Sequence, residues 1–374
     1  MTDFVPSTTR ELRSTVSDDG TISLALHEAA LPTPGPDQVV VRIEAAPINP
    51  SDLALLVANA DPASFTNGEG STSAPIIEGL GALKARFDKA LVAGNEGGGV
   101  VVAAGSSDAA QALIGRTVGF VSGDAYAEYR VVHVMACLPM PEGTDPVDAA
   151  SSFVNPLTAL GMGETMRGEG HTAIVHTVGA SNLGQMLQRI CNDDGVDLVN
   201  IVRKPEHVEM LKSQGATHVV DSSSDSFVDD LTDALRATKA TIVFDAIGGG
   251  DLVGTILGRM EKVATEGAEY NRYGSDTLKQ AYIYGGLDRS PTVLNRSFGL
   301  GWSVGGWLLT PFLAKMGADA QRLRDRVANE ITTTFASGYG MRLSLDDAVD
   351  AANVAQYAKM ATGAKALVMP QGVR

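Results

Sequence analysis

The feature that most constrains the fold is an alternation of apolar β-type runs with helix-like stretches in the second half of the chain. The β-type runs occupy residues 173–178, 197–202, 218–220, 241–246 and 281–286. Parallel strands are joined by crossover helices, so this alternation is typical of a parallel sheet built from βαβ units. The fold class predicted for this region is therefore α/β, with a doubly wound parallel sheet.

The first β-type run ends in a turn of small residues. The strand sequence TAIVHTV is followed by the turn GASNLG and then by the helical sequence GQMLQRICNDD. A tight turn between a strand and a helix brings backbone N–H groups and the helix N-terminus to a phosphate. The pattern is not a full G-x-G-x-x-G, and such a turn also occurs for packing alone. The residues that we expect to bind a pyrophosphate are Gly179, Ala180, Ser181, Asn182, Leu183 and Gly184.

The end of the second β-type run indicates which dinucleotide this turn would bind. Arg203 and Lys204 stand at the end of DLVNIVRK, where an NAD enzyme has Asp or Glu. A carboxylate there accepts hydrogen bonds from the adenosine ribose, whereas a basic pair faces a 2′-phosphate. We therefore expect NADPH rather than NADH. The alternative is that Arg203 is a solvated residue at the end of a strand.

The first part of the chain predicts a separate β domain. Residues 20–57 contain β-rich segments separated by Pro- and Gly-containing turns, without a helical period. From about residue 146 the sequence becomes rich in Ala, Leu and Met, and the α/β alternation follows. A helical and a β-type segment come after the α/β region, which suggests a return to the first domain. We expect a β domain of residues 1–150 and 338–374, and a nucleotide-binding domain of residues 151–337.

Two segments fit neither pattern. Residues 58–90 begin as a Gly-, Ser-, Thr- and Pro-rich loop and end in a short amphipathic helix candidate. Residues 262–280 interrupt a helix-to-strand connection with a polar stretch that carries Tyr270 and Tyr273. Long loops in compact domains often act as lids, so both segments are candidates for the substrate side.

Composition excludes several function classes. The 374 residues carry a net charge of −15, which disfavours binding to nucleic acid or to an anionic membrane. The two cysteines, Cys137 and Cys191, lie far apart, as expected in a reducing compartment. No apolar run approaches the length that spans a bilayer, so we expect a soluble, cytoplasmic protein.

Motifs in a fixed order along most of the chain resemble a known family. These motifs are INPSD at 48–52, AGNEGGGVVVAAGS at 93–106, AYAEY at 125–129, NPLTAL at 155–160, GASNLGQ at 179–185, GATHVVDSSSDSF at 215–227 and FDAIGGG at 244–250. Together they resemble the zinc-independent medium-chain dehydrogenase/reductase superfamily, in its quinone oxidoreductase-like and 2-enoyl thioester reductase-like groups. The resemblance implies a GroES-like β domain followed by a Rossmann domain, and a homodimer formed by strand pairing between Rossmann domains.

The resemblance also implies catalysis without a metal. Zinc members of the superfamily carry a Cys near the first motif and a His-Glu pair in the second. This chain has Asn49, Pro50 and Ser51 at the first position and Asn95 with Glu96 at the second. Zinc members also carry a run of four Cys for a structural zinc site, which the two cysteines of this chain cannot build. We therefore expect no bound metal.

The same resemblance assigns site residues around the nicotinamide and the substrate. Asn155 and Thr158 match the NPLTA positions near the nicotinamide, and Asn49 and Asp52 match cleft positions that bind cofactor or substrate. Further cofactor contacts are implied for Ile247, Tyr284, Gly285 and Gly286, at the carboxyl ends of two β-type runs. Ordinary alternatives are a turn role for Asn49 and a hydrogen bond from Thr158 to its own helix.

The proton donor is the least defined part of the predicted site. Enoyl thioester reductases are expected to have a catalytic Tyr shortly after INPSD, yet residues 53–125 contain no Tyr. Tyr273 or Tyr270 is one candidate to replace it, and solvent is another. With Asn49, Asp52 and Thr158, Tyr273 completes the predicted catalytic set.

Three functions remain open at this point. The first is an NADPH-dependent, zinc-independent oxidoreductase that transfers hydride to a quinone or an α,β-unsaturated carbonyl. The second is a 2-enoyl thioester reductase, and the third is an NADPH-binding scaffold or sensor without turnover. The expected partners are a small-molecule carbonyl or quinone substrate and a second copy of the chain, with no nucleic acid and no membrane.

Overall fold

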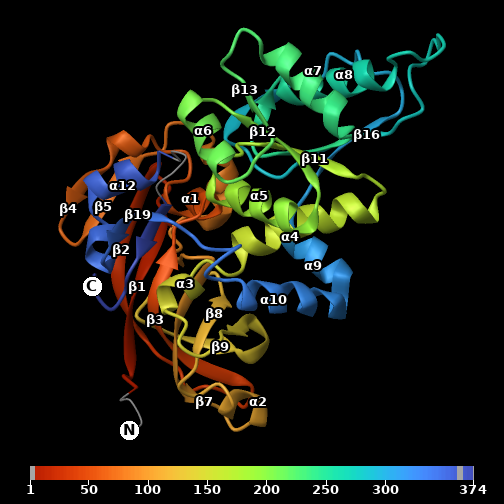
Figure 1. Cartoon of the computed structure of the whole chain (residues 1–374). Coiled ribbons are helices and arrows are strands. Elements are labelled where there is room, and N and C mark those ends of the chain that lie inside the picture. Colours follow the sequence, from red (N-terminus) through yellow and green to blue (C-terminus); the bar gives the residue numbers. More distant parts are fainter. Residues whose placement is uncertain (1–4, 360–364, 374) are drawn as a thin grey trace. The chain divides into compact units, whose positions relative to one another are not determined.

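The computed structural model describes residues 5–359 and 365–373. The chain forms two compact units, Met1–Val154 with Arg324–Arg374 (unit 1) and Asn155–Leu323 (unit 2). Figure 1 shows the elements of both units coloured along the sequence. The return to unit 1 comes earlier than the expected residue 338, because the helix α10 (Ala320–Asn329) already crosses into that unit.

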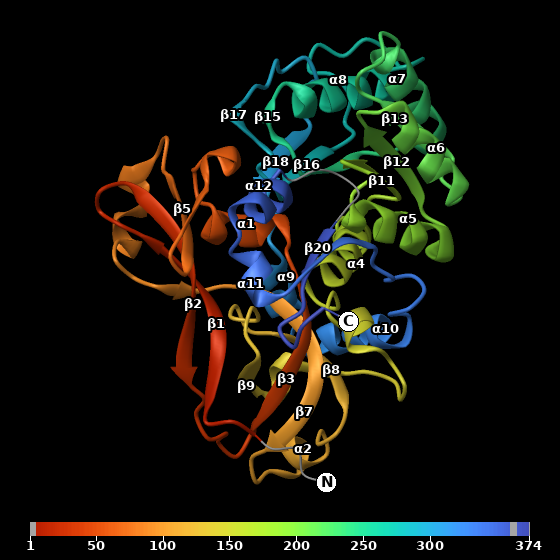
Figure 2. The same ribbon diagram turned by 90° about the vertical axis from the view of Figure 1, so that its left-hand side faces the viewer.

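Unit 1 is built from two sheets with mostly antiparallel pairing. A five-stranded sheet has the order β4-β5-β2-β1-β6, with bounds Thr66–Gly68, Ser71–Pro75, Thr21–Ala30, Thr8–Val16 and Leu91–Val92. A seven-stranded sheet has the strand order β10 (Cys137–Pro139), β8 (Thr117–Val121), β7 (Glu96–Ala104), β3 (Gln38–Pro47), β20 (Lys365–Val368) and β19 (Tyr339–Leu343). Its seventh strand, β9 (Tyr129–His133), pairs with β3. Figure 2 shows β1, β2 and β5 side by side at the edge of this unit.

Short helices complete unit 1. They are α1 (Pro50–Leu56), α2 (Asp108–Gln111), α3 (Pro146–Ala149), α11 (Leu345–Ala348), α12 (Ala351–Tyr357) and the 3-10 turns at Pro62–Ser64, Leu80–Arg86 and Val134–Ala136. The expected loop at 58–90 thus contains two short strands and two 3-10 turns. Alternate residues of its neighbouring strands, such as Ile22 and Leu24, are fully buried, so one face of each strand forms the core.

Unit 2 contains the predicted doubly wound parallel sheet. Its six strands follow the order β13 (His218–Asp221), β12 (Asp197–Val202), β11 (Ala173–Thr177), β14 (Ile242–Asp245), β16 (Lys279–Ile283) and β18 (Trp302–Gly306). All neighbouring strands of this sheet pair in parallel. Its helices are α4 (Val154–Gly168, whose first residue closes unit 1), α5 (Asn182–Asp194), α6 (Pro205–Ser213), α7 (Phe227–Thr238), α8 (Leu252–Ala264) and α9 (Leu309–Met316). A separate two-stranded sheet pairs β15 (Gly248–Gly250) with β17 (Asp288–Thr292). Helices flank the six-stranded parallel sheet in Figure 2, as the βαβ pattern predicts.

The two faces of the parallel sheet differ in chemistry. Val175 and Val243 face an apolar core that includes residues of α7 and α8. On the opposite face, Phe244 stacks against Tyr282 and meets the edge of Trp307, whose indole N–H donates to Thr165 on α4 at 3.0 Å. Successive side chains of a strand alternate between faces, so His176 shares this second, more polar face.

Three strands of unit 2 end earlier than the sequence predicted, whereas β12 ends where predicted and β13 ends one residue later. β11 ends at Thr177 because Val178 has a positive φ of 58°. β14 ends at Asp245, whose carboxylate accepts from the amide of Gly248 at 2.7 Å and turns the chain. β16 ends at Ile283, before Tyr284. Among the described residues, no helix is both long and apolar enough to cross a bilayer.

Candidate functional site

The turn after β11 is shaped by backbone contacts at the carboxyl edge of the parallel sheet. The amide of Gly179 donates to the carbonyl of Ile201 on the neighbouring strand β12 at 3.0 Å. Ser181 is the N-cap of α5, and its side chain accepts from the amide of Gly184 at 3.0 Å. The turn therefore holds the N-terminus of a 13-residue helix at the edge of the sheet, which is the arrangement of an anion site.

The close approach of backbones in this turn requires glycine. A Cβ atom on Gly184 would lie 2.2 Å from the carbonyl oxygen of Gly179, and a Cβ on Gly179 would lie 2.6 Å from Oδ1 of Asn200. Without side chains at these positions, a phosphate can approach the backbone amides directly. The residues present thus fit the pyrophosphate of a dinucleotide.

Two cations follow β12 next to this turn. Arg203 is exposed and stands two positions after Ile201, which bonds Gly179. Lys204 is the N-cap of α6 and forms a 3.6 Å ion pair with Glu206. The structure therefore brings both basic residues beside the Gly179–Gly184 turn. A positive charge here suits the 2′-phosphate of NADPH.

Two further segments meet at the same carboxyl edge, where β14 and β16 end. The carboxylate of Asp245 accepts from the amides of Ile247 and Gly248 and from the hydroxyl of Thr177 at 2.7–3.1 Å. The amide of Tyr284 donates to the Asp245 carbonyl at 2.9 Å, and a Cβ on Gly285 would lie 2.5 Å from the carbonyl oxygen of Ala246. The predicted residues Ile247, Tyr284, Gly285 and Gly286 are therefore gathered in one place.

A buried histidine backs Tyr284. Nε2 of His176, on β11, lies 2.7 Å from the Tyr284 hydroxyl, and the two rings stack with centroids 5.9 Å apart. His176 is fully buried, and this burial lowers its pKa to about 3, so its imidazole is neutral. Burial, and then the negative charge of Asp245, raise the pKa of Tyr284.

Unit 1 holds a second cluster, which consists of buried polar residues around α1. Asn49 caps this helix, and its amide donates to Oδ2 of Asp52 at 2.8 Å. The amide of Asn95 donates to the other Asp52 oxygen at 2.8 Å, and Nδ2 of Asn49 donates to Oε1 of Glu96 at 3.0 Å. Burial raises the pKa of Asp52 to about 6, against the two backbone hydrogen bonds, which lower it.

Glu96 and Lys365 extend this cluster. The second oxygen of Glu96 accepts from the amides of Phe153 and Val154 at 2.8 and 2.9 Å. Nζ of Lys365, on β20, donates to Oγ of Ser151 at 2.9 Å. Burial lowers the pKa of Lys365, while the charges of Glu96 and Asp52 oppose that shift. Sequence reasoning assigned no role to Ser151 or Lys365, and the only available signal was a lysine within an apolar β-type run.

The chain resembles known proteins and solved structures at low sequence identity. No protein-family model matches it. It is 27% identical to the synaptic vesicle membrane protein VAT-1 homolog of Rattus norvegicus over 254 residues, 66% of this chain and 56% of that protein. It is 25% identical to the mitochondrial enoyl-acyl-carrier-protein reductase of Xenopus tropicalis over 280 residues, 72% of this chain and 68% of that protein. The chain therefore spans little more than half the length of the VAT-1 relative.

Among solved structures, a Mesorhizobium loti protein assigned as an NADPH:quinone reductase superposes with a TM-score of 0.74 at 24% identity, covering 98% of this chain and 100% of that one. The chain has the two-domain fold of the medium-chain dehydrogenases/reductases. The resemblance seen in the motifs is confirmed, because the relatives and structural neighbours are quinone oxidoreductase-like and enoyl reductase-like members of that superfamily.

Within this medium-chain dehydrogenase/reductase fold, the predicted residues fall into two sets. Asn49 and Asp52 lie in unit 1, where they share the buried cluster with Glu96. The residues predicted to bind the cofactor lie in unit 2, including Asn155 and Thr158, which are 8% and 6% exposed on α4. The residues of each set are therefore held in place by contacts within their own unit.

The tyrosines of the 262–280 segment lie at the other edge of the parallel sheet. Residues 265–278 of this segment connect the C-terminus of α8 to Lys279, the first residue of β16. Tyr273 is 52% exposed and Tyr270 is 93% exposed, and Arg272 lies over the Tyr273 ring at 4.5 Å from its centroid. Because the nucleotide turn lies at the carboxyl edge, the structure does not bring Tyr273 together with the other residues of unit 2 predicted for the site.

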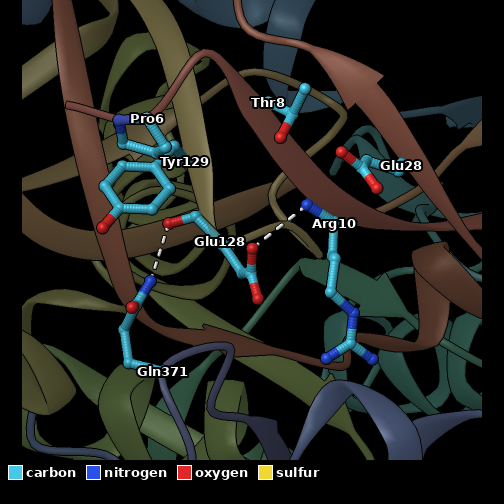
Figure 3. A pocket seen from close by; sticks show the side chains of 7 residues that line it. All are labelled: Pro6, Thr8, Arg10, Glu28, Glu128, Tyr129 and Gln371. Atoms are coloured by element: carbon cyan, nitrogen blue, oxygen red, sulfur yellow. Dashed lines mark hydrogen bonds between the residues drawn. The ribbon is translucent and has the colours of Figure 1, made fainter.

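Possible metal ligands, thiols and a surface pocket are the other features of the described residues that bear on a site. In residues 5–359 and 365–373, no three His, Cys, Asp or Glu side chains are grouped so as to hold a metal ion. Cys137 and Cys191 are free and buried, and burial raises the pKa of each thiol to about 12. A pocket of about 420 Å³ in unit 1 (Figure 3) holds none of the predicted site residues; it is lined by Pro6, Thr8, Arg10, Glu28, Glu128, Tyr129 and Gln371.

Proposed function

We propose that this protein is an NADPH-dependent oxidoreductase that transfers hydride to a quinone or an α,β-unsaturated carbonyl, without a catalytic metal. The observation that carries the proposal is the glycine turn at the N-terminus of α5 with Arg203 beside it. The relatives named as reductases support the reaction class. The amide side chains of Asn49 and Asn95, where zinc members of the superfamily have ligands, support the absence of a metal.

In this proposal the residues of the turn bind the cofactor's phosphates. The amides between Gly179 and Gly184 and the N-terminus of α5 hold the pyrophosphate. Arg203, with Lys204 next to it, pairs with the 2′-phosphate and so selects NADPH over NADH. When bound, NADPH supplies the hydride, and the chain's own residues orient the reactants and stabilise the charge that develops.

The buried cluster of unit 1 positions Asn49 for this role. Both oxygens of Asp52 and both oxygens of Glu96 accept hydrogen bonds, which fixes the backbone and the amide group of Asn49. Oδ1 of Asn49 is buried and has no hydrogen-bond partner among the described residues. We assign this oxygen as an acceptor for a donor group on a bound ligand, because an unpaired buried acceptor costs free energy until it is satisfied.

The test measures NADPH and NADH oxidation against a quinone, a short enone and a crotonyl thioester at matched concentrations. Turnover of the quinone or enone with NADPH preferred supports the proposal. Arg203→Ala is expected to raise the KM for NADPH about tenfold or more, with little effect on the KM for NADH, because a charge-assisted contact to the 2′-phosphate is lost. Lys204→Ala is the matched control and is expected to have the smaller effect. Equal effects of Arg203→Ala on both cofactors would contradict the assignment.

Two other functions are distinguished by the same assay. Turnover of the crotonyl thioester alone would favour an enoyl thioester reductase, which the Xenopus relative supports and the missing Tyr after INPSD disfavours. Tight NADPH binding without turnover of any substrate would favour a cofactor-binding scaffold or sensor. The VAT-1 relative, which is named for a vesicle membrane and not for a reaction, keeps that third function open.

A further inference from the structure

The pair formed by His176 and Tyr284 joins two strands that are not neighbours. His176 stands on β11 and Tyr284 directly after β16, and β14 separates these strands in the sheet. Their side chains meet above β14 with 2.7 Å between Nε2 and the hydroxyl oxygen. Tyr284 is only partly buried, whereas His176 has no exposed surface. The histidine therefore lies on the buried side of the tyrosine and holds its hydroxyl in place.

The second ring nitrogen of His176 decides the direction of this hydrogen bond. Nδ1 is buried and has no hydrogen-bond partner among the described residues. If the proton were on Nδ1, a buried N–H donor would be left unpaired, which is rarer in folded proteins than the unpaired acceptor that Nδ1 becomes when the proton is on Nε2. If the proton is on Nε2, it donates to the Tyr284 oxygen, and the hydroxyl proton of Tyr284 stays free for another acceptor.

We propose that Tyr284 donates a hydrogen bond to a carbonyl oxygen of the bound ligand, and that His176 holds it as a donor through an Nε2–H to oxygen hydrogen bond. The inference rests on the proposed function for the identity of the ligand. Two carbonyl oxygens would be present at this edge, that of the nicotinamide carboxamide and that of the conjugated substrate. Both are acceptors of the same chemistry.

The charges around Tyr284 favour a hydrogen-bond donor over a source of protons. The carboxylate of Asp245 accepts hydrogen bonds from three donors, the hydroxyl of Thr177 and the amides of Ile247 and Gly248. Its negative charge opposes ionisation of the nearby tyrosine. Tyr284 therefore keeps its proton throughout, and its contribution is to stabilise negative charge on the ligand oxygen.

The tautomer of His176 is the first test and needs no ligand. Long-range proton–nitrogen NMR of protein labelled with 15N-histidine distinguishes the two neutral tautomers. The His176→Gln variant assigns the His176 signal by its loss. We expect neutral His176 with its proton on Nε2 at neutral pH. A proton on Nδ1 would overturn the proposal, because Tyr284 would then be donating to the histidine and not to a ligand.

Variants then test the ligand contact. Tyr284→Phe is expected to reduce either the affinity for NADPH or kcat by about 3- to 10-fold, the value of one hydrogen bond. His176→Leu is expected to give a similar loss, while His176→Gln, whose amide also donates, is expected to restore most of it. The control is Tyr282→Phe on the same strand, whose hydroxyl is already bonded to Glu169 at 2.7 Å and should leave binding and turnover unchanged.

Two readouts separate the two carbonyl oxygens. A weaker Kd for NADPH, measured by its fluorescence, supports contact with the carboxamide. A lower kcat at saturating NADPH with an unchanged Kd supports contact with the substrate carbonyl. A folded Tyr284→Phe protein that changes neither quantity would overturn the proposal. Failure of the wild-type protein to bind NADPH would instead overturn the proposed function, and it is recognised before any variant is made.

Discussion

Asp52 is a residue whose environment works against its charge. It is 3% exposed, and burial raises its pKa to about 6, with Glu96 adding to the shift and Lys365 and two backbone amides opposing it. An acid with a raised folded pKa binds its proton more tightly in the folded state. Its contribution to the free energy of unfolding is therefore fully present below the ordinary pKa of 3.8 and is lost as the pH rises through about 6.

Replacing this carboxyl by an amide should remove that pH dependence. We expect wild type to gain stability relative to Asp52→Asn as the pH falls from 7 to 4, by up to about 3 kcal/mol, the value of a shift of roughly two pKa units. Urea denaturation of both proteins across this pH range is the measurement. Asp18→Asn, at an exposed turn position, controls for the loss of one negative charge. Parallel pH curves for wild type and Asp52→Asn would contradict the assigned pKa.

Val178 is a second residue that the fold holds against its preference. Its φ of 58° lies in the left-handed region, which is unfavourable for a β-branched side chain. We expect Val178→Gly to raise the free energy of unfolding by about 1 kcal/mol, because relief of strain exceeds the entropy that glycine adds to the unfolded chain. Val202→Gly, at a buried position in β12 without positive φ, should destabilise the protein instead. Destabilisation by Val178→Gly in urea titrations would mean that the side chain packs favourably enough to outweigh the strain.

At the scale of elements, α8, β16 and the polar segment between them are held together by a buried ion pair. Glu261 on α8 pairs with Lys279 on β16, and these residues are 7% and 0% exposed. The same carboxylate accepts from the amide and the hydroxyl of Ser275 at 2.7 and 2.6 Å. Although burial raises it, bonds from Lys279 and Ser275 lower the pKa of Glu261 overall, so the carboxylate stays charged. The 262–280 segment is thus anchored at the amino edge of the sheet.

Breaking this pair from one side should be costly. Lys279→Met is expected to destabilise the protein by about 3–5 kcal/mol, because it leaves an uncompensated buried carboxylate. The double variant Lys279→Met with Glu261→Gln should lose less than Lys279→Met alone, since no charge is left unpaired. Arg236→Met breaks an exposed pair with Glu266 and should cost at most about 1 kcal/mol. Denaturant midpoints for the variants test this order of stabilities. A double variant that is less stable than Lys279→Met would contradict it.

Elements differ in how far the sequence predicts them. The β11, α5 and β12 unit was predicted because its apolar periods and its glycine turn are local signals. The pairings of His176 with Tyr284 and of Asn49 with Glu96 join residues far apart in the sequence, so no local pattern indicates them. β18 is not among the predicted β-type runs, because its small residues give no alternation of apolar and polar positions. The placement of Tyr273 depends on which edge of the sheet its segment joins, which is a property of topology.

At the scale of the whole molecule, the parallel sheet has an open edge. β18 ends the strand order of the six-stranded sheet, and among the described residues it pairs only with β16. Leu300 and Leu308, which flank this strand, are 70% and 64% exposed. An exposed edge strand with apolar neighbours invites pairing with another chain. We therefore expect a homodimer that joins two parallel sheets through β18.

Light scattering should give a mass of twice 38.9 kDa for this dimer. The net charge of −15 on each chain opposes association, so raising the salt concentration should shift the equilibrium towards the dimer. Leu300→Asp together with Leu308→Asp should weaken the dimer, because they place four new charges at the interface. Ile77→Asp, an equally apolar exposed position in unit 1, should leave the mass unchanged. A monomer mass at high protein and salt concentration would exclude the β18 interface, whereas dissociation by Ile77→Asp would move it to unit 1.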